Sequence, residues 1–440
     1  MALNLQFIEQ EIIDQFIYDE SSRPWIVGFS GGKDSTMLLQ VVWRALRKID
    51  PVILNQRRIY IVCNDTMVEN PRIVKFIKKT LERIQIAARE EGMPITVHET
   101  TPQLEDSFWV RLIGLGYPAP NRFVRWCTER LKINPTTQFI KEKIGEQGEA
   151  IILLGTRSAE SANRAKSIAK HERKGKRLRK HQLPSAWVFA PIKDVTTNEV
   201  WQYLNQVPPP WGGTHKELVT LYRNANAGDC PLVIDETTPS CGSSRFGCWT
   251  CTVVNKDKSM EGLIENGEEW MQPLSEIRDF LVETRDNPEQ YRDRRRRNGE
   301  IKENIWGPYL FKTRAEILRR ILVAQKEIQK EERAELITQQ ELVLIQYHWF
   351  RDSFFEIKVS DIFNEVFRNN IDMSKQEEKQ REEEELLSKS CKEEPLDLKF
   401  IMDGLALQKT KTLLMRKRGL QADLENRLDQ LINEIKEAKQ

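Results

Sequence analysis

The chain has 440 residues, enough for two or three domains at roughly 150 residues per domain. Its 68 Lys and Arg against 66 Asp and Glu give a net charge of +2, which excludes a uniformly basic nucleic-acid-binding coat but allows local basic patches. No run of about 18 apolar residues occurs, which excludes a membrane-spanning helix, and acids stand where a secretory signal would have Lys or Arg. We therefore expect a cytoplasmic protein.

Short apolar runs alternate with helical patterns over the first half of the chain. Such alternation predicts an α/β fold with a parallel sheet and helices on both faces. Ligands of these sheets bind beyond the carboxyl ends of the strands. The predicted strands are 25–29, 59–63, 95–98, 150–154 and 186–190, and the predicted helices are 5–17, 35–48, 71–91, 134–144 and 196–206.

Differences in amino-acid composition divide the chain into three parts. Residues 1–207 form the predicted α/β domain, residues 208–260 are rich in Gly and Cys, and residues 261–440 are mainly helical and charge-rich. Within the last part, residues 374–394 have little to bury and are expected to form a linker or a solvated helix. A leucine stripe at 420–435 fits either a helix packed on its own domain or a partner-binding helix.

The strongest local signal is Ser30-Gly31-Gly32-Lys33-Asp34-Ser35, between a predicted strand and a predicted helix. Its glycines let the backbone approach a ligand closely, and the free N–H groups at a helix start favour an anion. Lys33 adds a positive charge, and the two serines add hydroxyl groups. The pattern lacks the Gly and the Ser or Thr that a Walker A loop requires. An ordinary glycine turn is the alternative interpretation.

This loop resembles the SGGxDS signature of the PP-loop ATP pyrophosphatases, which grips the pyrophosphate of ATP. Three further segments resemble the phosphoadenylylsulfate reductases and occur in the same order as there. The resemblance implies an adenine nucleotide α-hydrolase-like fold and cleavage of ATP between its α- and β-phosphates, with adenylate passing to the substrate. The segments are 64–69, which has Met67 where that family usually has Gly, 155–164 and 190–201.

The residues of these segments suit a nucleotide site that holds ATP and Mg²⁺. Acidic groups near the first two strands are expected to bind Mg²⁺ or ribose hydroxyls, with Asp34 favoured as the metal partner. Arg157 and Arg164 are candidates for clamping phosphates bidentately, and a surface ion pair is the alternative for either. The resemblance makes nucleotide-binding candidates of Ser30, Gly31, Gly32, Lys33, Asp34, Ser35, Asp65, Thr66, Glu69 and Gly155.

Four cysteines are crowded into a loop-rich stretch, which indicates a metal site. Tetrahedral thiolates suit zinc or an iron–sulfur cluster, and spacing alone does not choose between them. A zinc ribbon usually carries two CxxC pairs and only one occurs here, so the unequal spacing and the attached domain favour a [4Fe–4S] cluster. The expected ligands are Cys230, Cys241, Cys248 and Cys251.

Cys127 stands apart in the segment 125–132, which resembles the RxCCxxxK segment of cluster-binding sulfonucleotide reductases. Trp126 occupies the position of the first Cys of that motif, so the cluster of those enzymes is not expected intact. The neighbouring Arg125, Arg130 and Lys132 are expected to lower the pKa of Cys127 and favour the thiolate. We therefore predict a catalytic, sulfur-carrying Cys127, with a buried inert thiol as the alternative; Cys63 is expected in the core.

Together these motifs resemble the DndC family, the sulfurtransferases of DNA phosphorothioation. The resemblance implies that ATP activates a DNA backbone phosphate and that sulfur replaces a non-bridging oxygen. It also implies a cysteine desulfurase as sulfur donor and other DNA phosphorothioation proteins as partners. The alternatives are a sulfonucleotide reductase, a tRNA-thiolating enzyme and a non-enzymatic scaffold subunit of a DNA-modification complex. The expected catalytic residues are Cys127, Lys33, Asp34, Arg157 and Arg164.

The basic run 164–180 is the expected contact with DNA phosphates, because it directly follows the segment at 155–157. Phosphate contacts alone carry no base information, so no sequence readout is predicted. A solvated loop is the alternative for this run. A second basic run, at 292–297, is a further candidate for the DNA contact.

Overall fold

The structure, a computed structural model, describes residues 3–19, 21–160, 162–171, 176–225, 247–254, 256–296, 300–330, 334–352, 354, 357–369, 371, 385–390 and 401. The predicted linker at 374–394 lies mostly outside these residues, and the leucine stripe at 420–435 lies wholly outside them.

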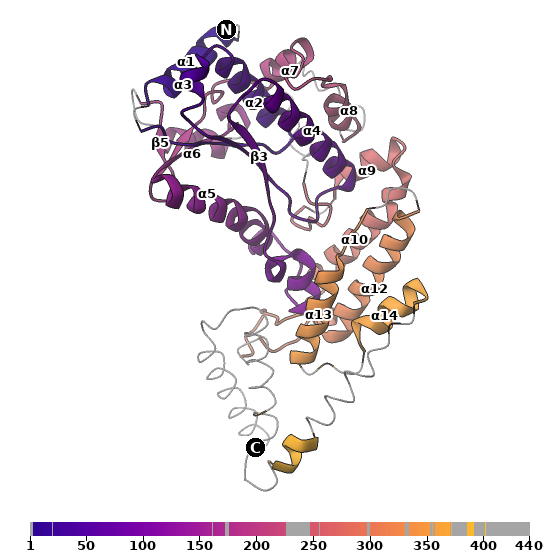
Figure 1. Cartoon of the computed structure of the whole chain (residues 1–440). Helices are drawn as coiled ribbons and strands as arrows, with labels where there is room; N and C mark the ends of the chain where they lie inside the picture. Colours follow the sequence, from indigo (N-terminus) through magenta and orange to yellow (C-terminus); the bar gives the residue numbers. More distant parts are fainter. Residues whose placement is uncertain are drawn as a thin grey trace. The chain divides into compact units, whose positions relative to one another are not determined.

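A six-stranded sheet organises the first half of the chain (Figure 1). Its order is β3-β2-β1-β4-β6-β5, and every pairing is parallel except that of β5 with β6. The predicted parallel α/β fold is therefore confirmed. The strands are β1 (Trp25–Gly28), β2 (Ile59–Asn64), β3 (Ile95–Thr100), β4 (Ala150–Leu153), β5 (Arg179–Lys180) and β6 (Ala186–Phe189).

Both faces of the sheet are buried because alternate strand residues point to opposite sides. In β1, Trp25 and Val27 join a large core with α1, α2, α4 and α7, whereas Ile26 packs on the other face with Phe139 of α5. The helices of this part are α1 (Leu5–Ile17), α2 (Lys33–Leu46), α3 (Pro51–Leu54), α4 (Pro71–Glu90), α5 (Asn134–Gln147), α6 (Ala162–His171), α7 (Thr197–Gln206), α8 (Lys216–Ala225) and α9 (Lys258–Glu265).

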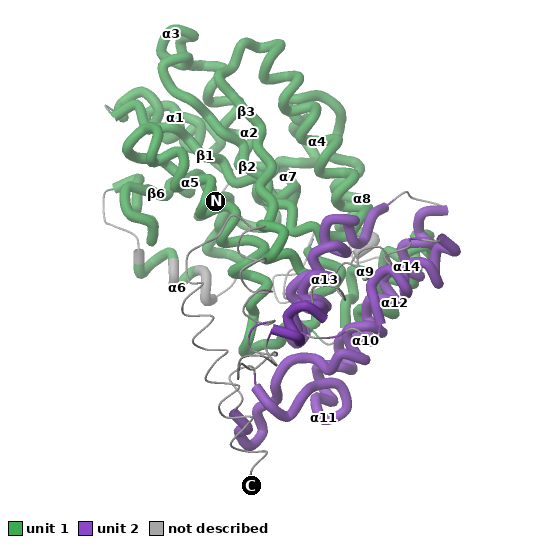
Figure 2. The backbone as a smooth tube through the Cα atoms, turned by 60° about the horizontal axis from the view of Figure 1, so that its bottom comes forward, with its two compact units in different colours: residues 1–108, 120–278 green, residues 109–119, 279–440 purple. Residues whose placement is uncertain are grey.

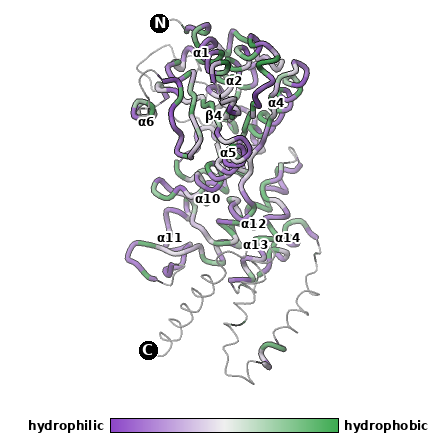
Figure 3. The backbone as a smooth tube through the Cα atoms, turned by 60° about the vertical axis from the view of Figure 1, so that its left-hand side comes forward, coloured by the Kyte–Doolittle hydropathy of each residue, from purple (hydrophilic) through white to green (hydrophobic). Residues whose placement is uncertain are grey.

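Local chemistry explains where several of these helices begin. Asn70 accepts a hydrogen bond from the N–H of Arg72 at the start of α4, and Pro71 takes the first helical position. At α7, Thr196 and Glu199 form a reciprocal capping box. Around the sheet, helices such as α4 alternate between hydrophilic and hydrophobic stretches, as one-sided burial requires (Figure 3).

The chain divides into two compact units (Figure 2). The first comprises residues 1–108 and 120–278 and contains the sheet, and the second comprises 109–119 and 279–440. The three-part division expected from the sequence stays a prediction. Short helical turns of the first unit are η1 (Leu104–Asp106), η3 (Thr128–Ile133), η4 (Ser158–Glu160) and η5 (Glu269–Met271), and α10 (Gln272–Asp286) contains the boundary at 278.

The second unit is helical in its described part. Two buried indoles connect its segments. The indole N–H of Trp109 donates to the carbonyl of Leu336 at 2.7 Å, and that of Trp349 donates to the carbonyl of Ile113 at 3.0 Å. Arg314 is buried and donates to the carbonyls of Gly114 and Tyr309. The elements are η2 (Val110–Gly114), α11 (Pro288–Tyr291), α12 (Phe311–Ile328), α13 (Gln339–Arg351) and α14 (Val359–Phe367). Among the described residues, no helix is both long enough and apolar enough to cross a bilayer.

Candidate functional site

The sheet changes direction between β1 and β4. From β1 the chain builds β2 and β3 to one side, and β4 then pairs with the opposite edge of β1. In such sheets the crevice outside the carboxyl ends at this switch point is where ligands bind. The loop 29–32 leaves β1 there, and the segment beginning at Gly155 leaves β4 beside it.

The loop after β1 is shaped by its glycines and tied by its serines. Gly31 has φ +71°, a left-handed conformation that Gly adopts without penalty. A Cβ at Gly31 would also lie 2.6 Å from Ile77. The hydroxyl groups of Ser30 and Ser35 are 3.1 Å apart, and that of Ser35 donates to the carbonyl of Gly32 at 3.0 Å. The loop therefore presents its backbone at the start of α2, as the sequence predicts.

Asp34 lies between two cations. Its carboxylate accepts a hydrogen bond from Nε of Arg157 at 2.8 Å and lies 3.2 Å from Nζ of Lys33. Arg157 is 1% exposed and also donates to the carbonyl of Val195 at 3.0 Å. A buried Arg with these partners positions the carboxylate. The predicted phosphate clamp by Arg157 therefore stays a prediction, because the structure gives its guanidinium protein partners.

Gly155 is required where the β4 segment meets the loop. A Cβ at this position would lie 2.9 Å from the carbonyl oxygen of Asp34 and 3.2 Å from the backbone nitrogen of Ser35. Both neighbours are backbone atoms, so no side chain can move to make room. The predicted nucleotide-binding residues of the two segments are thus in direct backbone contact.

Tyr222 of α8 is a member of this site that the sequence analysis missed. Its hydroxyl accepts a hydrogen bond from the backbone N–H of Lys33 at 3.2 Å, and the Lys33 ammonium lies 5.4 Å from its ring centroid. Trp201 of α7 packs edge-on against the same ring. No local motif marks Tyr222, because it lies 189 residues beyond Lys33 in the sequence.

The segment after β2 meets the CxxC segment. Thr66 is fully buried, and its hydroxyl lies 3.3 Å from Sγ of Cys248 and 3.1 Å from the Glu69 carboxylate. Lys132 forms an ion pair with Glu69 at 3.4 Å. Asp65 accepts a hydrogen bond from the N–H of Met67 at 2.8 Å. Thr66 and Glu69, expected to bind nucleotide or Mg²⁺, therefore lie against a thiol.

Burial and charge shift the pKa values of both Cys248 and Lys132. Burial, with the Glu69 carboxylate as a second cause, raises the pKa of the Cys248 thiol to about 12. Burial would lower the pKa of Lys132, yet the negative charges of Cys248 and Glu69 raise it above its usual value.

Met67 has φ +63°, so the position where the resembling family usually has Gly is indeed left-handed here.

The expected lowering of the Cys127 pKa is wrong. Burial, followed by the charge of Cys251, raises the pKa of Cys127, and Lys132 offsets this only in part. Arg130 contributes little because it is paired with Asp106 at 2.7 Å. Burial and the neighbouring thiol of Cys251 therefore outweigh the cations near Cys127.

Trp126, which replaces the tandem Cys of the related motif, is buried and stacked on Phe108 with ring centroids 5.4 Å apart. Cys127 directly precedes η3, a π-helix, and such helices occur frequently at functional sites. Cys63 is buried in β2, as expected.

Two buried side chains fix the CxxC segment, and neither was singled out from the sequence. Arg278 is 2% exposed, and its guanidinium donates to the carbonyls of Cys251 and Val254. The hydroxyl of Thr252 donates to the carbonyl of Pro120 at 2.6 Å. The segment that carries Cys127 is thereby joined to the one that carries Cys251.

The four predicted cluster ligands are only half described. Cys248 and Cys251 are placed, whereas Cys230 and Cys241 lie outside the described residues. Among the residues that are described, no three His, Cys, Asp or Glu side chains are arranged to hold a metal ion. Soft thiolates suit an iron–sulfur cluster, so the donor chemistry fits the prediction. The complete ligand set stays a prediction.

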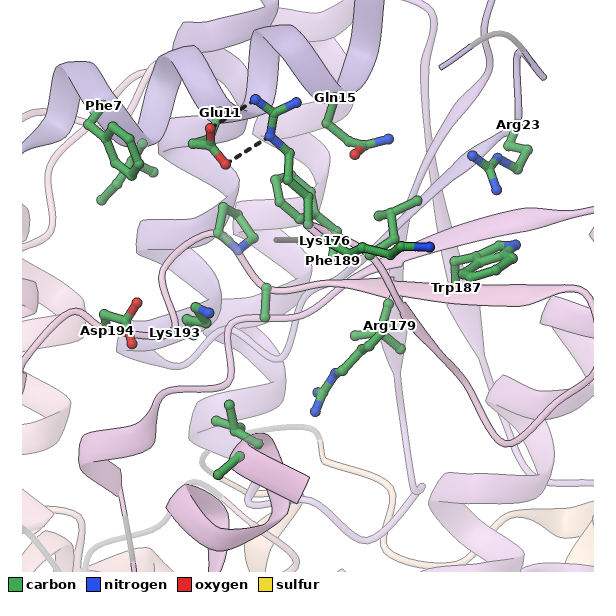
Figure 4. Close-up of a pocket in the computed structure, with 18 residues that line it drawn as sticks. Phe7, Glu11, Gln15, Arg23, Lys176, Arg179, Trp187, Phe189, Lys193 and Asp194 are labelled. Atoms are coloured by element: carbon green, nitrogen blue, oxygen red, sulfur yellow. Dashed lines mark hydrogen bonds and ion pairs between the residues drawn. The ribbon is translucent and has the colours of Figure 1, made fainter. Parts of the chain in front are cut away.

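The predicted DNA patch at 164–180 is described in part. Arg164 lies on α6, and residues 172–175 are outside the described residues. Arg177 forms ion pairs with Glu11 at 2.8 Å and Asp14 at 2.9 Å. The patch borders a cavity of about 1180 Å³ between α1, α6, β5 and β6. Figure 4 shows Arg179 pointing away from Glu11 in this cavity. Part of the expected charge is therefore neutralised within the protein.

Comparison with known proteins identifies the family. Residues 24–254 match the phosphoadenosine phosphosulfate reductase domain family, which is more than half of the chain, and the protein belongs to this family. An uncharacterized protein of Methanocaldococcus jannaschii is 28% identical over 202 residues, 46% of this chain and 35% of that protein. The chain thus spans about a third of the length of that relative.

The solved structures that match part of the chain do so at low sequence identity and low TM-score. The phosphoadenylyl-sulfate reductase of Candida auris is 11% identical with a TM-score of 0.26, covering 48% of this chain and 91% of that one. The U34-tRNA thiolase of Methanococcus maripaludis, solved with its [4Fe-4S] cluster, is 12% identical with a TM-score of 0.29, covering 68% and 82%. The FMN adenylyltransferase of Candida glabrata is 13% identical with a TM-score of 0.29, covering 51% and 60%.

Proposed function

We propose that the protein is an ATP pyrophosphatase and sulfurtransferase that modifies the DNA backbone. It would adenylate a non-bridging phosphate oxygen and replace that oxygen with sulfur. DNA is the substrate, a cysteine desulfurase supplies the sulfur, and other DNA phosphorothioation proteins present the DNA. The family membership supports sulfur chemistry on an adenylated group, and the DndC-like arrangement of motifs favours DNA as the acceptor.

One juxtaposition carries the proposal. The loop 30–35 follows β1, and the segment that contacts Cys248 follows β2, which is the parallel neighbour of β1. Because carboxyl ends of parallel strands meet at one edge, an anion-binding loop and a thiol site share that edge of the sheet. The proposed reaction uses both sites at this edge, the loop for activation of the DNA phosphate by ATP and the thiol site for delivery of sulfur.

The chemistry balances in two steps. A DNA phosphate oxygen attacks the α-phosphorus of ATP, and pyrophosphate leaves toward the loop. A sulfur nucleophile at the level of hydrosulfide then attacks the DNA phosphorus, AMP leaves with the original oxygen, and a proton is released. When the sulfur arrives as a persulfide, a second thiol cleaves the S–S bond and supplies the two electrons by forming a disulfide.

The residues of the loop have separate roles in the first step. Lys33 and the N–H groups that begin α2 would bind the pyrophosphate, since a helix start favours anions. Asp34, oriented by Arg157, is the candidate to hold Mg²⁺, whose preferred ligands are oxygens. These assignments, and that of Gly155 as a close-approach residue, form one connected site through the contacts of Asp34.

The thiol site allows two roles for Cys127. As a sulfur carrier it would pass sulfur to the activated phosphate, and the cluster would be held by Cys230, Cys241, Cys248 and Cys251. As a neighbour of Cys251 it could instead take one ligand position. Iron content separates the two, because Cys127→Ser keeps the iron of the wild type in the first case and loses iron in the second. Cys63→Ser, in the core, is the matched control.

Two related activities remain as alternatives. A sulfonucleotide reductase would act on a preformed adenylyl sulfate and would not need ATP. A tRNA-thiolating enzyme would use the same activation on a nucleobase. A scaffold subunit without enzyme activity is the third alternative, and the intact loop with its ion-paired Asp34 argues against it.

The products of ATP test the proposal. The purified protein with DNA and its partners should form AMP and pyrophosphate. The Lys33→Ala variant should lose this activity while its melting temperature stays that of the wild type. Lys78→Ala, an exposed lysine on α4, is the charge-matched control. Formation of ADP and phosphate, and never pyrophosphate, would contradict the proposal.

A further inference from the structure

An aromatic side chain projects from the loop beside the thiol site. Phe123 is 95% exposed, and Val124 beside it is 54% exposed. Single exposed apolar residues are common on proteins, but a Phe that is almost completely exposed contributes no hydrophobic stabilisation to the fold. Such a side chain is available for contact with a partner molecule.

The turn that carries Phe123 is well fixed. Oδ1 of Asn121 accepts hydrogen bonds from the N–H groups of Phe123 and Val124, both at 2.8 Å. The N–H of Asn121 donates to the carbonyl of Val124 at 3.1 Å. On one side the adjoining Pro120 accepts from Thr252, and on the other the buried Trp126 stacks on Phe108. A preorganised side chain loses little conformational freedom on binding.

The residues on either side of the apolar pair are cationic. Arg122 and Arg125 are both exposed, and neither forms a hydrogen bond or ion pair through its side chain within the described part of the chain. This differs from Arg177 of the predicted DNA patch, which two carboxylates neutralise. Exposed guanidinium groups that precede and follow an exposed aromatic residue in the chain supply the charges and the ring that bind a base with its adjoining phosphates.

We propose that Phe123 stacks on a nucleobase of the nucleic-acid substrate while Arg122 and Arg125 contact the adjoining phosphates. This inference rests on the proposed function and deepens it, because it names the contact that brings a backbone phosphate to the thiol site. Base stacking is tolerant of sequence, since every base has a π-face. The contact therefore positions the strand and leaves sequence choice to other proteins.

The reach of the loop fits this role. Phe123 and Cys127 are four residues apart, and four extended residues span at most about 14 Å. Successive nucleotides in one strand of B-DNA advance by about 3.4 Å. The Cα atoms of Phe123 and Cys127 are thus separated by no more than the length of about four nucleotides.

Binding of the full-length protein to a fluorescein-labelled 20-nucleotide DNA, measured by anisotropy at several salt concentrations, tests the proposal. Phe123→Ala should weaken binding by about 5- to 150-fold, the range for loss of one base stack. Phe123→Trp should retain affinity, and Phe123→Leu should not restore it. Tyr18→Ala removes an aromatic side chain that is 76% exposed elsewhere and should have no effect.

The salt dependence gives a second readout. Replacing Arg122 and Arg125 together by Ala should reduce the slope of log affinity against log salt by about 1.4 to 1.8, since each phosphate contact contributes about 0.7 to 0.9. The matched control replaces the exposed Lys78 and Lys79 of α4 and should leave the slope unchanged.

The outcomes separate this inference from the proposed function. If wild type binds DNA and Phe123→Ala or Phe123→Leu binds it equally well, the stacking contact is refuted and the proposed function survives. If Phe123→Ala keeps its DNA affinity but no longer binds the desulfurase, the loop is a protein-docking surface and the inference is wrong. If wild type does not bind DNA at all, both fail.

Discussion

Gly155→Ala tests whether the β4 segment and the nucleotide loop act as one site. The new Cβ would lie 2.9 Å from the carbonyl oxygen of Asp34, whereas ordinary contacts begin at 3.4 Å, so the two backbones must separate by about 0.5 Å. Overpacking of this kind costs about 1–3 kcal/mol. Because the displaced residue is Asp34, the change also moves the carboxylate that we assign to Mg²⁺.

Two measurements should report this displacement. Thermal unfolding should shift downward by about 2–4 °C for each kcal/mol lost. Pyrophosphate formation should fall by roughly ten-fold, since a misplacement of 1 Å can cost about 100-fold. The effect on activity should therefore exceed what partial unfolding explains at the assay temperature.

Gly145→Ala is the matched control for the same chemical change. Gly145 lies in α5, and a Cβ there would meet nothing within 4 Å. Ala in a helix is favoured over Gly by about 0.5–1 kcal/mol, so this variant should be slightly more stable and fully active. A Gly155→Ala protein with wild-type stability and activity would refute the close contact on which the site depends.

Three further predictions follow from buried contacts. Burial lowers the pKa of His215 to about 4, so the fold favours the neutral ring. The free energy of unfolding should therefore be about 3 kcal/mol higher above pH 6.5 than near pH 4, and it should fall as the pH drops through this window. Urea titrations of His215→Gln should lack this pH-dependent change. Tyr222→Phe removes the acceptor of the Lys33 N–H and should raise the KM for ATP by about 2- to 10-fold with an unchanged melting temperature. Arg278→Ala removes the donors to the carbonyls of Cys251 and Val254 and should lower stability by about 2–3 kcal/mol and reduce iron content; full iron loading in this variant would show that the contact does not support the cysteines.

Much of the first unit is predictable because its signals are local. The apolar strands and the loop at 30–35 are contiguous in the sequence, and the alternation of strands and helices predicts a parallel sheet. The order of its strands depends on contacts between distant segments and comes from the structure alone. β5 was missed because Arg179–Lys180 is a two-residue, basic edge strand with no apolar alternation.

The site residues that sequence analysis missed act over long separations. Tyr222, Thr252 and Arg278 reach partners on other elements, and no periodicity or motif encodes such pairings. The error over Cys127 has a related cause. Neighbouring Arg and Lys were counted as charges that favour the thiolate, but burial and the nearby Cys251 outweigh them, and Asp106 already pairs Arg130.

The most direct test of the central claim is mass spectrometry of nuclease-digested DNA from cells that carry the protein with its partners. The proposal predicts phosphorothioate-linked dinucleotides with the wild type and with Gly145→Ala, and none with Lys33→Ala or Asp34→Ala. Wild-type DNA without phosphorothioate, accompanied by a thiolated nucleoside in tRNA that is lost in the same two variants, would contradict the assignment of DNA as the substrate.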